Sequence, residues 1–439
     1  MNENKSHILI VYQFFYPENF RTNDIALELV KRGHKVTVLT GIPNYPEGKF
    51  YKGYGLFKKR RETWNGIDII RIPLIPRGKT KIGLILNYLS FPVSGFFWNL
   101  FCSKKIKADQ VYMTETSPMN QCKVGVQYGR KYNVPVTLYV QDLWPENVEI
   151  ITGIKSPLLN KPLMRMTQKI FAGCDRIMGT SPAFERIIKE RAEEAVKKYG
   201  FKGKKVQLDS TGKPLQGPIV SYFPQYAEDV YEPVPKRERQ GFWIGFTGNI
   251  GDAQGLEVLP ETAKILKKNS HNVHFMIVGN GRAKDRLLAR IHELDVDDYF
   301  EFLPRVSPEK IPDILAGCDV GYISFMNHPF FANTIPAKLQ SYMACGKAIL
   351  ALAGGETARI VEEADCGVCV RLENIVRSSD GEGTLSRDGE KAFELSKAIV
   401  ELMSWSHQAI DEAGMRGYEY NKIHFDKKTL MDELEGYLS

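Results

Sequence analysis

Two glycine-rich turns in the second half of the chain lie where a strand is expected to end and a helix to begin. They read FTGNIGDAQGLE at residues 246–257 and IVGNGR at residues 277–282. Glycine lets a ligand approach the backbone closely, and the free N–H groups at the start of a helix can hold a phosphate. One such turn is usually only a tight connection. Two of them, followed by NTIPAKLQSYMACGKAIL at residues 333–350, favour a site for a phosphorylated ligand.

The strands and helices that must position such a site alternate along the chain. The opening run HILIVYQFF, residues 7–15, is apolar and contains β-branched residues, as in a strand buried on both faces. A helix is expected over Asn23–Arg32 and a second strand over Lys35–Leu39, which together form a βαβ unit with parallel strands. Further strands are expected at Ile69–Ile72, Gln110–Met113, Val136–Tyr139 and Arg176–Gly179.

The alternation restarts after Ser221–Gln240, a segment rich in proline and charge that is expected to link two domains. Loops are expected at Ala192–Gln216 and Ser378–Gly389. The predicted fold class is α/β, with two doubly wound Rossmann-like domains that bind ligands at the carboxyl ends of their strands, in a cleft between them. The second domain is expected to contain strands at Phe242–Phe246, Val273–Val278, Phe300–Leu303, Val320–Ile323, Ala348–Ala351 and Val368–Arg371, and helices at Leu256–Lys268 and Arg282–Leu294.

Composition excludes several classes of protein. A chain of 439 residues with 43% hydrophobic and 25% charged residues is neither disordered nor a small disulfide-rich protein. A net charge of +7 spread over this length does not indicate a nucleic-acid binder. The seven scattered cysteines indicate reduced thiols, and the short polar N-terminus shows no signal-peptide pattern, so a cytoplasmic protein is expected. Neither Cys366 with Cys369 nor His271 with His274 has further ligands nearby in the sequence, and no metal or other cofactor is expected.

One uncharged segment, Ile82–Phe101, is about as long as a bilayer-spanning helix. Its Asn, Ser, Pro and Gly residues and the cations on both sides leave three interpretations. They are two buried helical segments broken near Pro92, a patch lying in the plane of a membrane, and a spanning helix. Cations that could face anionic headgroups are Lys52, Lys58, Lys59, Arg60, Arg61, Arg77, Lys79 and Lys81, and Lys104, Lys105 and Lys107 follow the segment.

Six segments, distributed in order along almost the whole chain, carry a family resemblance. They are YPENFRTND (Tyr16–Asp24), KRGHKVTVLTGIPNYPEG (Lys31–Gly48), VQDLWPEN (Val140–Asn147), FTGNIGDAQGLE, IVGNGR and TIPAKLQSYMACGK (Thr334–Lys347). Together they resemble the retaining GT-B glycosyltransferases of family 4, and most nearly the fucosamine-transferase-like branch that builds capsule, colanic-acid and O-antigen repeat units in bacteria. The resemblance implies transfer of a sugar from a nucleotide diphosphate with retention at the anomeric carbon, usually without a bound metal.

The same resemblance implies a domain plan. Residues 1–222 are expected to bind the acceptor, and residues 242–420 are expected to bind the nucleotide sugar. Residues 223–241 would link the two domains, and a last helix within residues 421–439 would cross back to the first domain.

The chain departs from this family at charged positions. Relatives carry an Arg and a Lys after the first glycine-rich turn, where this chain has Asp252 and Gln254. We therefore expect Arg282 and Lys338 to supply positive charge to the diphosphate. Three further family positions, two Glu and one His, are replaced here by Thr334, Ser341 and Gln141.

The chemistry of sugar transfer sets the role of each candidate. Negative charge builds on the leaving diphosphate oxygen and is stabilised by backbone N–H groups, a helix N-terminus and a cation. The acceptor hydroxyl loses a proton, which a carboxylate or the departing phosphate can accept. The expected catalytic residues are Asp142, Glu18 and Lys338. The residues expected to bind the donor are Gly248, Asn249, Gly251, Gln254, Gly279, Asn280, Arg282, Asn333, Thr334, Ile335 and Ser341, and those expected to bind the acceptor are Arg21, Asn23, Gln141 and Glu146.

The expected partners follow from the same resemblance. They are a nucleotide-sugar donor, such as a UDP-N-acetylamino sugar, a polyprenyl-diphosphate-linked saccharide as acceptor, and the inner surface of the cell membrane, with no nucleic acid. Two alternatives remain open on the sequence alone: a non-hydrolysing nucleotide-sugar epimerase, and a non-catalytic protein that binds a sugar nucleotide.

Overall fold

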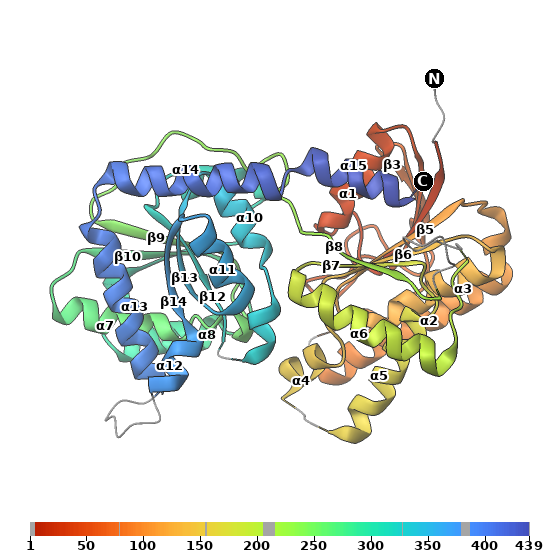
Figure 1. Ribbon diagram of the computed structural model, residues 1–439, viewed down its shortest axis with the longest axis horizontal. Coiled ribbons are helices and arrows are strands. Elements are labelled where there is room, and N and C mark those ends of the chain that lie inside the picture. The colour runs from red at the N-terminus through yellow and green to blue at the C-terminus, as the bar shows by residue number, and fades with distance from the viewer. Residues whose placement is uncertain are drawn as a thin grey trace. The chain divides into compact units, whose positions relative to one another are not determined.

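Two β-sheets organise the chain, one in each of two structural units (Figure 1). Unit 1 comprises Met1–Phe223 and Lys428–Ser439, and unit 2 comprises Pro224–Lys427. The computed structural model describes residues 5–78, 80–153, 156–204, 216–326, 328–378 and 387–438. The expectation of two α/β domains with parallel, Rossmann-like sheets is confirmed.

The sheet of unit 1 has the strand order β3-β4-β2-β1-β5-β6-β7-β8, and every neighbouring pair is parallel except β3 and β4. The order reverses between β1 and β5, and ligands of such sheets bind beside this reversal, at the carboxyl ends of the strands. The strands are β1 (His7–Val11), β2 (Lys35–Thr40), β3 (Arg61–Trp64), β4 (Ile67–Arg71), β5 (Gln110–Glu115), β6 (Val136–Val140), β7 (Arg176–Gly179) and β8 (Ile219–Tyr222).

The hairpin of β3 and β4 was not expected from the sequence, although a local signal for it is present. Asn65 and Gly66 connect the two strands with φ values of 49° and 81°. An Asn-Gly pair with both φ values positive is typical of the two-residue turns that match the twist of a β-hairpin.

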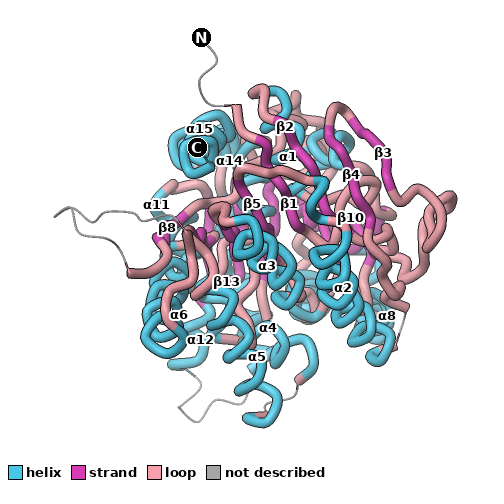
Figure 2. The backbone as a smooth tube through the Cα atoms, turned by 90° about the vertical axis from the view of Figure 1, so that its right-hand side faces the viewer, coloured by secondary structure: helices cyan, strands magenta, loops and turns pink. Residues whose placement is uncertain are grey.

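Helices cover both faces of this sheet, and Figure 2 shows α2 and α3 in front of one of them. The sequence predicts a loop over Ala192–Gln216, but α6 continues to Tyr199, because Ala192 and Ala195 are buried three residues apart on one helix face. Residues 205–215 of that expected loop lie outside the described part of the chain. The helices are α1 (Arg21–Lys31), α2 (Lys81–Phe101), α3 (Lys123–Tyr132), α4 (Glu146–Thr152), α5 (Pro157–Phe171) and α6 (Pro182–Tyr199).

The helix α2 runs without a break through Pro92. A proline inside a helix leaves the carbonyl four residues earlier without its helical N–H donor. Here that carbonyl, on Tyr88, accepts a hydrogen bond from Asn120 Nδ2 at 2.9 Å instead. The interpretation as two buried segments broken near Pro92 is therefore wrong.

The two faces of α2 differ in chemistry. Asn87 and Asn99 are buried against unit 1, whereas large apolar side chains on the opposite face are about half exposed. Within the described residues, Ile82–Phe101 is long and apolar enough to cross a bilayer, a test that core helices also pass. The exposed apolar residues, called the α2 stripe below, are Ile82, Ile85, Leu86, Leu89, Val93, Phe96, Phe97, Leu100 and Phe101.

The sheet of unit 2 has the strand order β11-β10-β9-β12-β13-β14, with all pairs parallel, and its order reverses between β9 and β12. Part of the loop expected at Ser378–Gly389 lies outside the described residues, and its two ends belong to α12 and α13. The strands are β9 (Phe242–Asn249), β10 (Val273–Asn280), β11 (Phe300–Leu303), β12 (Val320–Ser324), β13 (Ala348–Ala353) and β14 (Gly367–Arg371). The helices are α7 (Val258–Lys268), α8 (Lys284–Glu293), α9 (Ile311–Leu315), α10 (Ala337–Ala344), α11 (Gly355–Glu363), α12 (Leu372–Ser378), α13 (Arg387–Ser404) and α14 (His407–His424).

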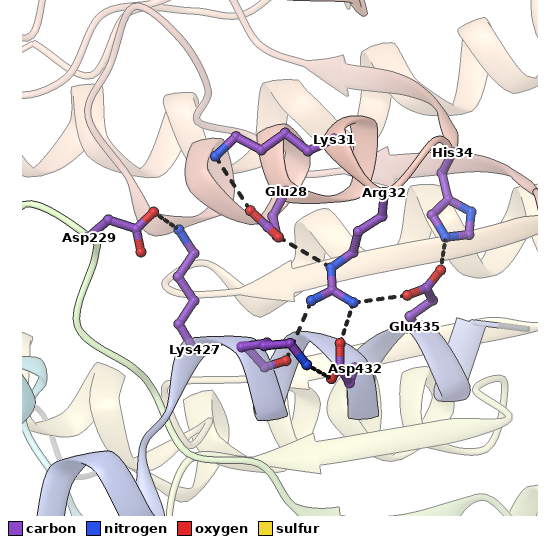
Figure 3. Close-up of polar contacts among 9 residues, drawn as sticks. Glu28, Lys31, Arg32, His34, Asp229, Lys427, Asp432 and Glu435 are labelled. Carbon is purple, nitrogen blue, oxygen red and sulfur yellow. Dashed lines mark hydrogen bonds and ion pairs between the residues drawn. The ribbon is translucent and has the colours of Figure 1, made fainter. Parts of the chain in front are cut away.

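The last helix, α15 (Lys427–Leu438), packs almost entirely within unit 1. Arg32, which follows α1, is the centre of its polar contacts (Figure 3). Its Nη1 donates to Asp432 Oδ1 at 2.6 Å and to Glu435 Oε2 at 2.9 Å. His34 Nε2 lies 3.0 Å from Glu435 Oε1. These contacts fix the C-terminal helix to the first βα unit of the chain.

Candidate active site

Three carboxyl groups of unit 1 gather at the carboxyl ends of β1, β5 and β6. Glu18 lies in the loop after β1, Glu115 is the last residue of β5, and Asp142 follows β6. Burial raises the pKa of the Tyr12 phenol, and the charges of all three carboxyl groups raise it further. The structure therefore brings the two predicted residues Glu18 and Asp142 into one neighbourhood, beside the β1–β5 reversal.

Glu18 is 2% exposed and is engaged with the loop that follows β2. Its Oε1 accepts the backbone N–H groups of Asn44 at 2.7 Å and Tyr45 at 2.6 Å. Burial raises the pKa of Glu18 to about 7, although these N–H donors and the charge of Arg71 act to lower it. Glu18 therefore positions the loop after β2, and its carboxyl group titrates near neutral pH.

Asp142 is held by Ser117, which follows β5. Asp142 Oδ2 accepts the backbone N–H of Ser117 at 2.9 Å and its hydroxyl at 3.0 Å. The same hydroxyl oxygen accepts from Trp144 Nε1 at 3.2 Å and Asn147 Nδ2 at 2.7 Å. Burial raises the pKa of Asp142 despite the bonds from Ser117. The carboxylate is fixed in orientation, and Oδ1 has no hydrogen-bond partner among the described residues.

Glu115 is a third carboxyl group, which was not expected from the sequence. It is fully buried at the end of β5, and its Oε2 accepts the backbone N–H of Asp142 at 3.2 Å. Its Oε1 is buried without a hydrogen-bond partner in the described part of the chain. Burial raises the pKa of Glu115 well above its usual range, and the nearby charge of Asp142 raises it further. The signal in the sequence is a lone Glu at the end of a strand that has no other charged residue.

Three of the residues expected to bind the acceptor lie around this carboxyl group cluster. Asn23 Nδ2 donates to the carbonyl of Glu18 at 2.7 Å, so it holds the loop between β1 and α1. The backbone N–H of Gln141 donates to the carbonyl of Glu115 at 2.8 Å, which continues the β5–β6 ladder. Arg21 begins α1, and its charge acts on the phenol of Tyr139 in β6.

Glu146, the fourth residue expected to bind the acceptor, is engaged elsewhere. Arg191 of α6 forms a two-pronged ion pair with its carboxylate and donates to the carbonyl of Trp144 at 3.0 Å. The pair fastens α4 to α6. We infer a structural role for Glu146, because its charge is already neutralised.

A chain of buried amides connects α2 to the loops of the site. Gln13 Nε2, after β1, donates to Asn87 Oδ1 at 2.9 Å. Asn87 Nδ2 donates to the carbonyl of Ile75 at 2.6 Å and lies 3.5 Å from Asn44 Oδ1. The backbone N–H of Asn44 in turn donates to Glu18. The face of α2 opposite its apolar stripe is therefore built into the carboxyl edge of the sheet.

In unit 2, the two glycine-rich turns meet at the ends of β9 and β10. Gly248 pairs with Gly279, and both have φ values near 140°, at 143° and 142°. A Cβ atom on Gly279 would lie 1.9 Å from the carbonyl oxygen of Gly248, so only glycine fits there. A Cβ atom on Gly248 would meet no heavy atom within 4 Å. The first turn therefore presents bare backbone to open space.

The turn after β9 is tied to β12, its neighbour across the order reversal. The Ser324 hydroxyl at the end of β12 donates to the carbonyl of Gln254 at 2.5 Å. The backbone N–H of Met326 donates to the carbonyl of Ala253 at 3.1 Å. These bonds fix the glycine-rich turn at the position where doubly wound sheets bind phosphates.

Lys338, near the start of α10, reaches this turn. Its Nζ donates to Gln254 Oε1 and lies 4.2 Å from the centre of the Phe246 ring. It forms no ion pair with a carboxylate among the described residues. Burial lowers the pKa of its amine to about 7. The structure thus brings the predicted residues Lys338 and Gln254 together and leaves the cation without a counter-ion.

Arg282, the other expected cation, has a counter-ion. Asp252 accepts from Arg282 Nε at 2.7 Å and from Arg286 Nη2 at 2.6 Å. Burial acts to raise the pKa of Asp252, but the hydrogen bonds and charges of the two arginines bring it below its usual value. Because one carboxylate is shared by two arginines, a net positive charge remains here. Unlike Lys338, however, Arg282 already has a carboxylate partner.

The other residues expected to bind the donor surround these turns. Thr334 Oγ1 is buried without a partner in the described part of the chain, whereas Ser341 Oγ donates to the carbonyl of Ala337 at 3.1 Å within α10. Thr334 therefore has an unused hydrogen-bonding group, whereas the hydroxyl of Ser341 is engaged within its own helix. Near Thr334, Asn333 ends a 3-10 turn and Ile335 is buried. In the second glycine-rich turn, Asn280 Oδ1 accepts the N–H of Gly281 at 2.9 Å. In the first turn, Asn249 is exposed and Gly251 precedes the short 3-10 turn Asp252–Gln254.

Comparison with known proteins links this geometry to one class of enzyme. Residues 231–399 match the family described as "Glycosyl transferases group 1". Over 371 residues the chain is 24% identical to the putative colanic acid biosynthesis glycosyl transferase WcaI of Escherichia coli strain K12. The matched region covers 81% of this chain and 84% of that protein.

Solved structures share the fold over the whole chain. Sucrose-phosphate synthase from Thermosynechococcus elongatus matches with a TM-score of 0.70 at 13% identity, covering 99% of this chain and 98% of that one. HepE of Anabaena, in complex with UDP and glucose, matches with a TM-score of 0.64 at 15% identity, covering 99% of both chains. At these identities the likeness is one of fold.

Replacing Glu18 with Gln tests the environment of this group. Its pKa is about 7 in the folded chain and 4.5 ordinarily, so between these values the folded state holds a proton that the unfolded chain releases. The resulting stability is fully present below pH 4.5 and is lost as pH rises through about 7. As the pH rises from below 4.5 to above 7, the free energy of unfolding of the wild type should therefore fall by about 3 kcal/mol more than that of Glu18→Gln. Urea titrations at each pH measure the difference, and parallel pH profiles for the two proteins would contradict the assignment.

Proposed function

We propose that this chain, which is a glycosyltransferase with the GT-B fold, transfers a sugar from a UDP-N-acetylamino sugar to a polyprenyl-diphosphate-linked saccharide. The sugar would move with retention at its anomeric carbon, in the synthesis of a bacterial surface polysaccharide. The observation that carries the proposal is Lys338, a cation without a counter-ion beside a glycine-rich turn at the β9–β12 reversal. The colanic acid glycosyl transferase WcaI and the UDP complex of HepE support this choice of pathway and donor.

Unit 2 offers the features that a nucleotide diphosphate requires. Gly248 leaves its backbone open for close approach, and the N–H groups of the adjoining turn can bind phosphate oxygens. The Lys338 ammonium neutralises the leaving diphosphate as the glycosidic bond breaks. Arg282 adds charge from the second turn, and the Thr334 hydroxyl is available to the sugar or the diphosphate.

The transfer step exchanges one bond at the anomeric carbon for another. The bond to the diphosphate oxygen breaks, its electron pair leaves with UDP, and the acceptor oxygen bonds to the same face of the sugar. The proton of the acceptor hydroxyl goes to the departing phosphate or to Asp142. Asp142 suits this role because Ser117 fixes one oxygen, which leaves Oδ1 for the acceptor.

The family match favours glycosyl transfer over the two alternatives, the epimerase and the non-catalytic binding protein. We propose that side chains supply the positive charge at the diphosphate and that the reaction uses no resident metal or other cofactor. Among the described residues, no group of three or more His, Cys, Asp and Glu lies close enough to hold a metal ion.

An acceptor attached to a polyprenyl chain stays in the bilayer, so the enzyme must reach the inner face of the membrane. The α2 stripe supplies an exposed apolar surface, and cations flank it on both sides. An apolar helix face together with basic residues suffices for reversible attachment in the plane of the interface. The buried face of α2 bonds through Asn87 to the loops of the acceptor site, so attachment there would bring that site to the lipid.

Replacing Lys338 with Ala should lower kcat/KM by about 2–3 kcal/mol, because a charge-stabilising donor to the leaving group is lost. Lys264→Ala, at an exposed lysine of α7 in the same unit, is the matched control and should leave kcat/KM unchanged. Initial rates with a panel of UDP-sugars measure the effect. Normal turnover by Lys338→Ala would move the role to Arg282.

Asp142→Asn should lower kcat by roughly 100-fold or more while donor KM stays near the wild-type value, since the base is lost but unit 2 is untouched. Burial raises the pKa of Asp142. Wild-type kcat should therefore fall as pH is lowered through that raised pKa, where the base becomes protonated. Glu146→Gln controls for loss of a carboxylate nearby. Equal losses in the two variants would argue against Asp142 as the base.

Replacing Leu89 and Phe97 of the α2 stripe with Ser should lower co-sedimentation with lipid vesicles by at least about tenfold, because two large apolar side chains lose their burial in the interface. Donor affinity should not change. The control variant replaces Leu288 and Phe393, which are exposed apolar side chains of unit 2. Unchanged vesicle binding by the α2 variant would contradict attachment through this helix.

A further inference from the structure

A surface cavity of 650 Å³ lies at the amino-terminal half of the unit 1 sheet, away from the carboxyl edge described above. The first residues of β1 and β2 contribute to it, as do β3, β4 and the segment that follows α2. Nothing in the proposed sugar transfer uses this cavity. Its lining residues are His7, Lys35, Thr37, Arg61, Glu62, Thr63, Asp68, Ile69, Ile70, Lys105, Ile106 and Lys107.

The cavity opens on the side of the sheet that carries α2. Asp68 pairs with Thr37 on one side and with Thr63 on the other, which places the three side chains on one face of the sheet. The opposing wall is Lys105–Lys107, which begins at the last residue of the short 3-10 turn Ser103–Lys105 after α2. Figure 2 shows α2 and α3 over this side of the sheet.

The charge of the cavity is predominantly positive. Four cations line it, and none of them forms an ion pair within the described residues: Lys35, Arg61, Lys105 and Lys107. Of the two carboxylates, Glu62 is paired with Arg71 at 2.6 Å and Asp68 accepts from the Thr63 hydroxyl at 3.3 Å. An anion entering the cavity would therefore meet excess positive charge.

The wall that carries two of these lysines is rigidly held. The Tyr128 hydroxyl donates to the carbonyl of Ile106 at 2.5 Å. His7 Nδ1 lies 2.9 Å from the carbonyl of Lys107, and His7 Nε2 lies 2.8 Å from the Thr37 hydroxyl. Because a carbonyl only accepts, Nδ1 carries the ring proton and Nε2 accepts from Thr37. The lysines thus project from a segment whose backbone is fixed to the sheet and to α3.

We propose that this cavity binds the phosphate-bearing headgroup of an anionic phospholipid when the α2 stripe lies in the membrane interface. The proposal rests on the attachment proposed above and gives it lipid selectivity. Leu100 and Phe101, at the end of the stripe, are 55% and 66% exposed, and Lys105 and Lys107 follow within a few residues. Acyl chains beside the stripe and a headgroup in the cavity form one continuous contact.

Vesicle binding with a cavity variant tests the proposal. The cavity variant carries Lys35→Ser, Lys105→Ser and Lys107→Ser, and the matched control carries Lys52→Ser, Lys58→Ser and Lys104→Ser. The control removes the same charge from nearby segments but not from the cavity. Co-sedimentation is compared between phosphatidylcholine vesicles and vesicles that also contain phosphatidylglycerol, at one ionic strength. The preference for phosphatidylglycerol should fall about tenfold further in the cavity variant than in the control.

The other outcomes separate this site from the attachment itself. An equal loss of the preference for phosphatidylglycerol in the cavity variant and the control would show a diffuse electrostatic effect and overturn the assignment of the headgroup to the cavity. In that case, weak binding of the Leu89 and Phe97 variant to both vesicle types would still support attachment through the α2 stripe. No vesicle binding by the wild type would overturn both. The last outcome is measured without vesicles. If inorganic phosphate raises the melting temperature of the wild type but not of the cavity variant, the cavity binds a free phosphate compound, and its assignment to a lipid headgroup is overturned.

Discussion

Burial of parallel strands on both faces is the constraint on which this structure depends. Strands such as β5 and β13 are buried along their whole length, so polar chemistry is confined to the strand ends. In each sheet the order reverses once beside a central strand, at β1–β5 and at β9–β12. The candidate groups of both units lie at these two reversals, and the glycine-rich turn of unit 2 is held there by bonds from the end of β12.

Both sites share a second physical feature, which is an ionisable group kept in a place that disfavours its charge. Lys338 lacks a carboxylate partner among the described residues, and burial brings the pKa of its amine to about 7. Glu18 and Glu115 have raised pKa values for the same reason. Such groups are costly to bury, so their presence at the carboxyl edges of the two sheets favours a functional role over a packing role. A diphosphate would provide the counter-ion that Lys338 lacks.

The sequence was sufficient to predict the features that local pattern determines. Apolar runs predicted six of the eight strands of the unit 1 sheet, all but β3 and β8, and all six strands of the unit 2 sheet. The glycine-rich turns were correctly expected at the ends of two strands, which are β9 and β10. Features that depend on distant residues were not predictable. Pro92 remains helical because Asn120 donates to the carbonyl that the proline leaves without a donor. Arg282 shares the carboxylate of Asp252 with Arg286, and the charge of Glu146 is neutralised by Arg191. A strand was predicted at β4, but its hairpin partner β3 was missed despite the Asn-Gly turn, because β3 is short, begins with two charged residues and has no buried residue.

Proton uptake on donor binding shows whether Lys338 is the cation that meets the diphosphate. Calorimetric titration with UDP-N-acetylglucosamine, in buffers of different ionisation enthalpy, counts the protons taken up. Because the pKa of the free amine is about 7, we expect uptake of nearly one proton at about pH 8 and little at about pH 6. In Lys338→Met the uptake at the higher pH should disappear. Donor binding without proton uptake by the wild type, or equal uptake by Lys338→Met, would show that Lys338 does not carry this charge.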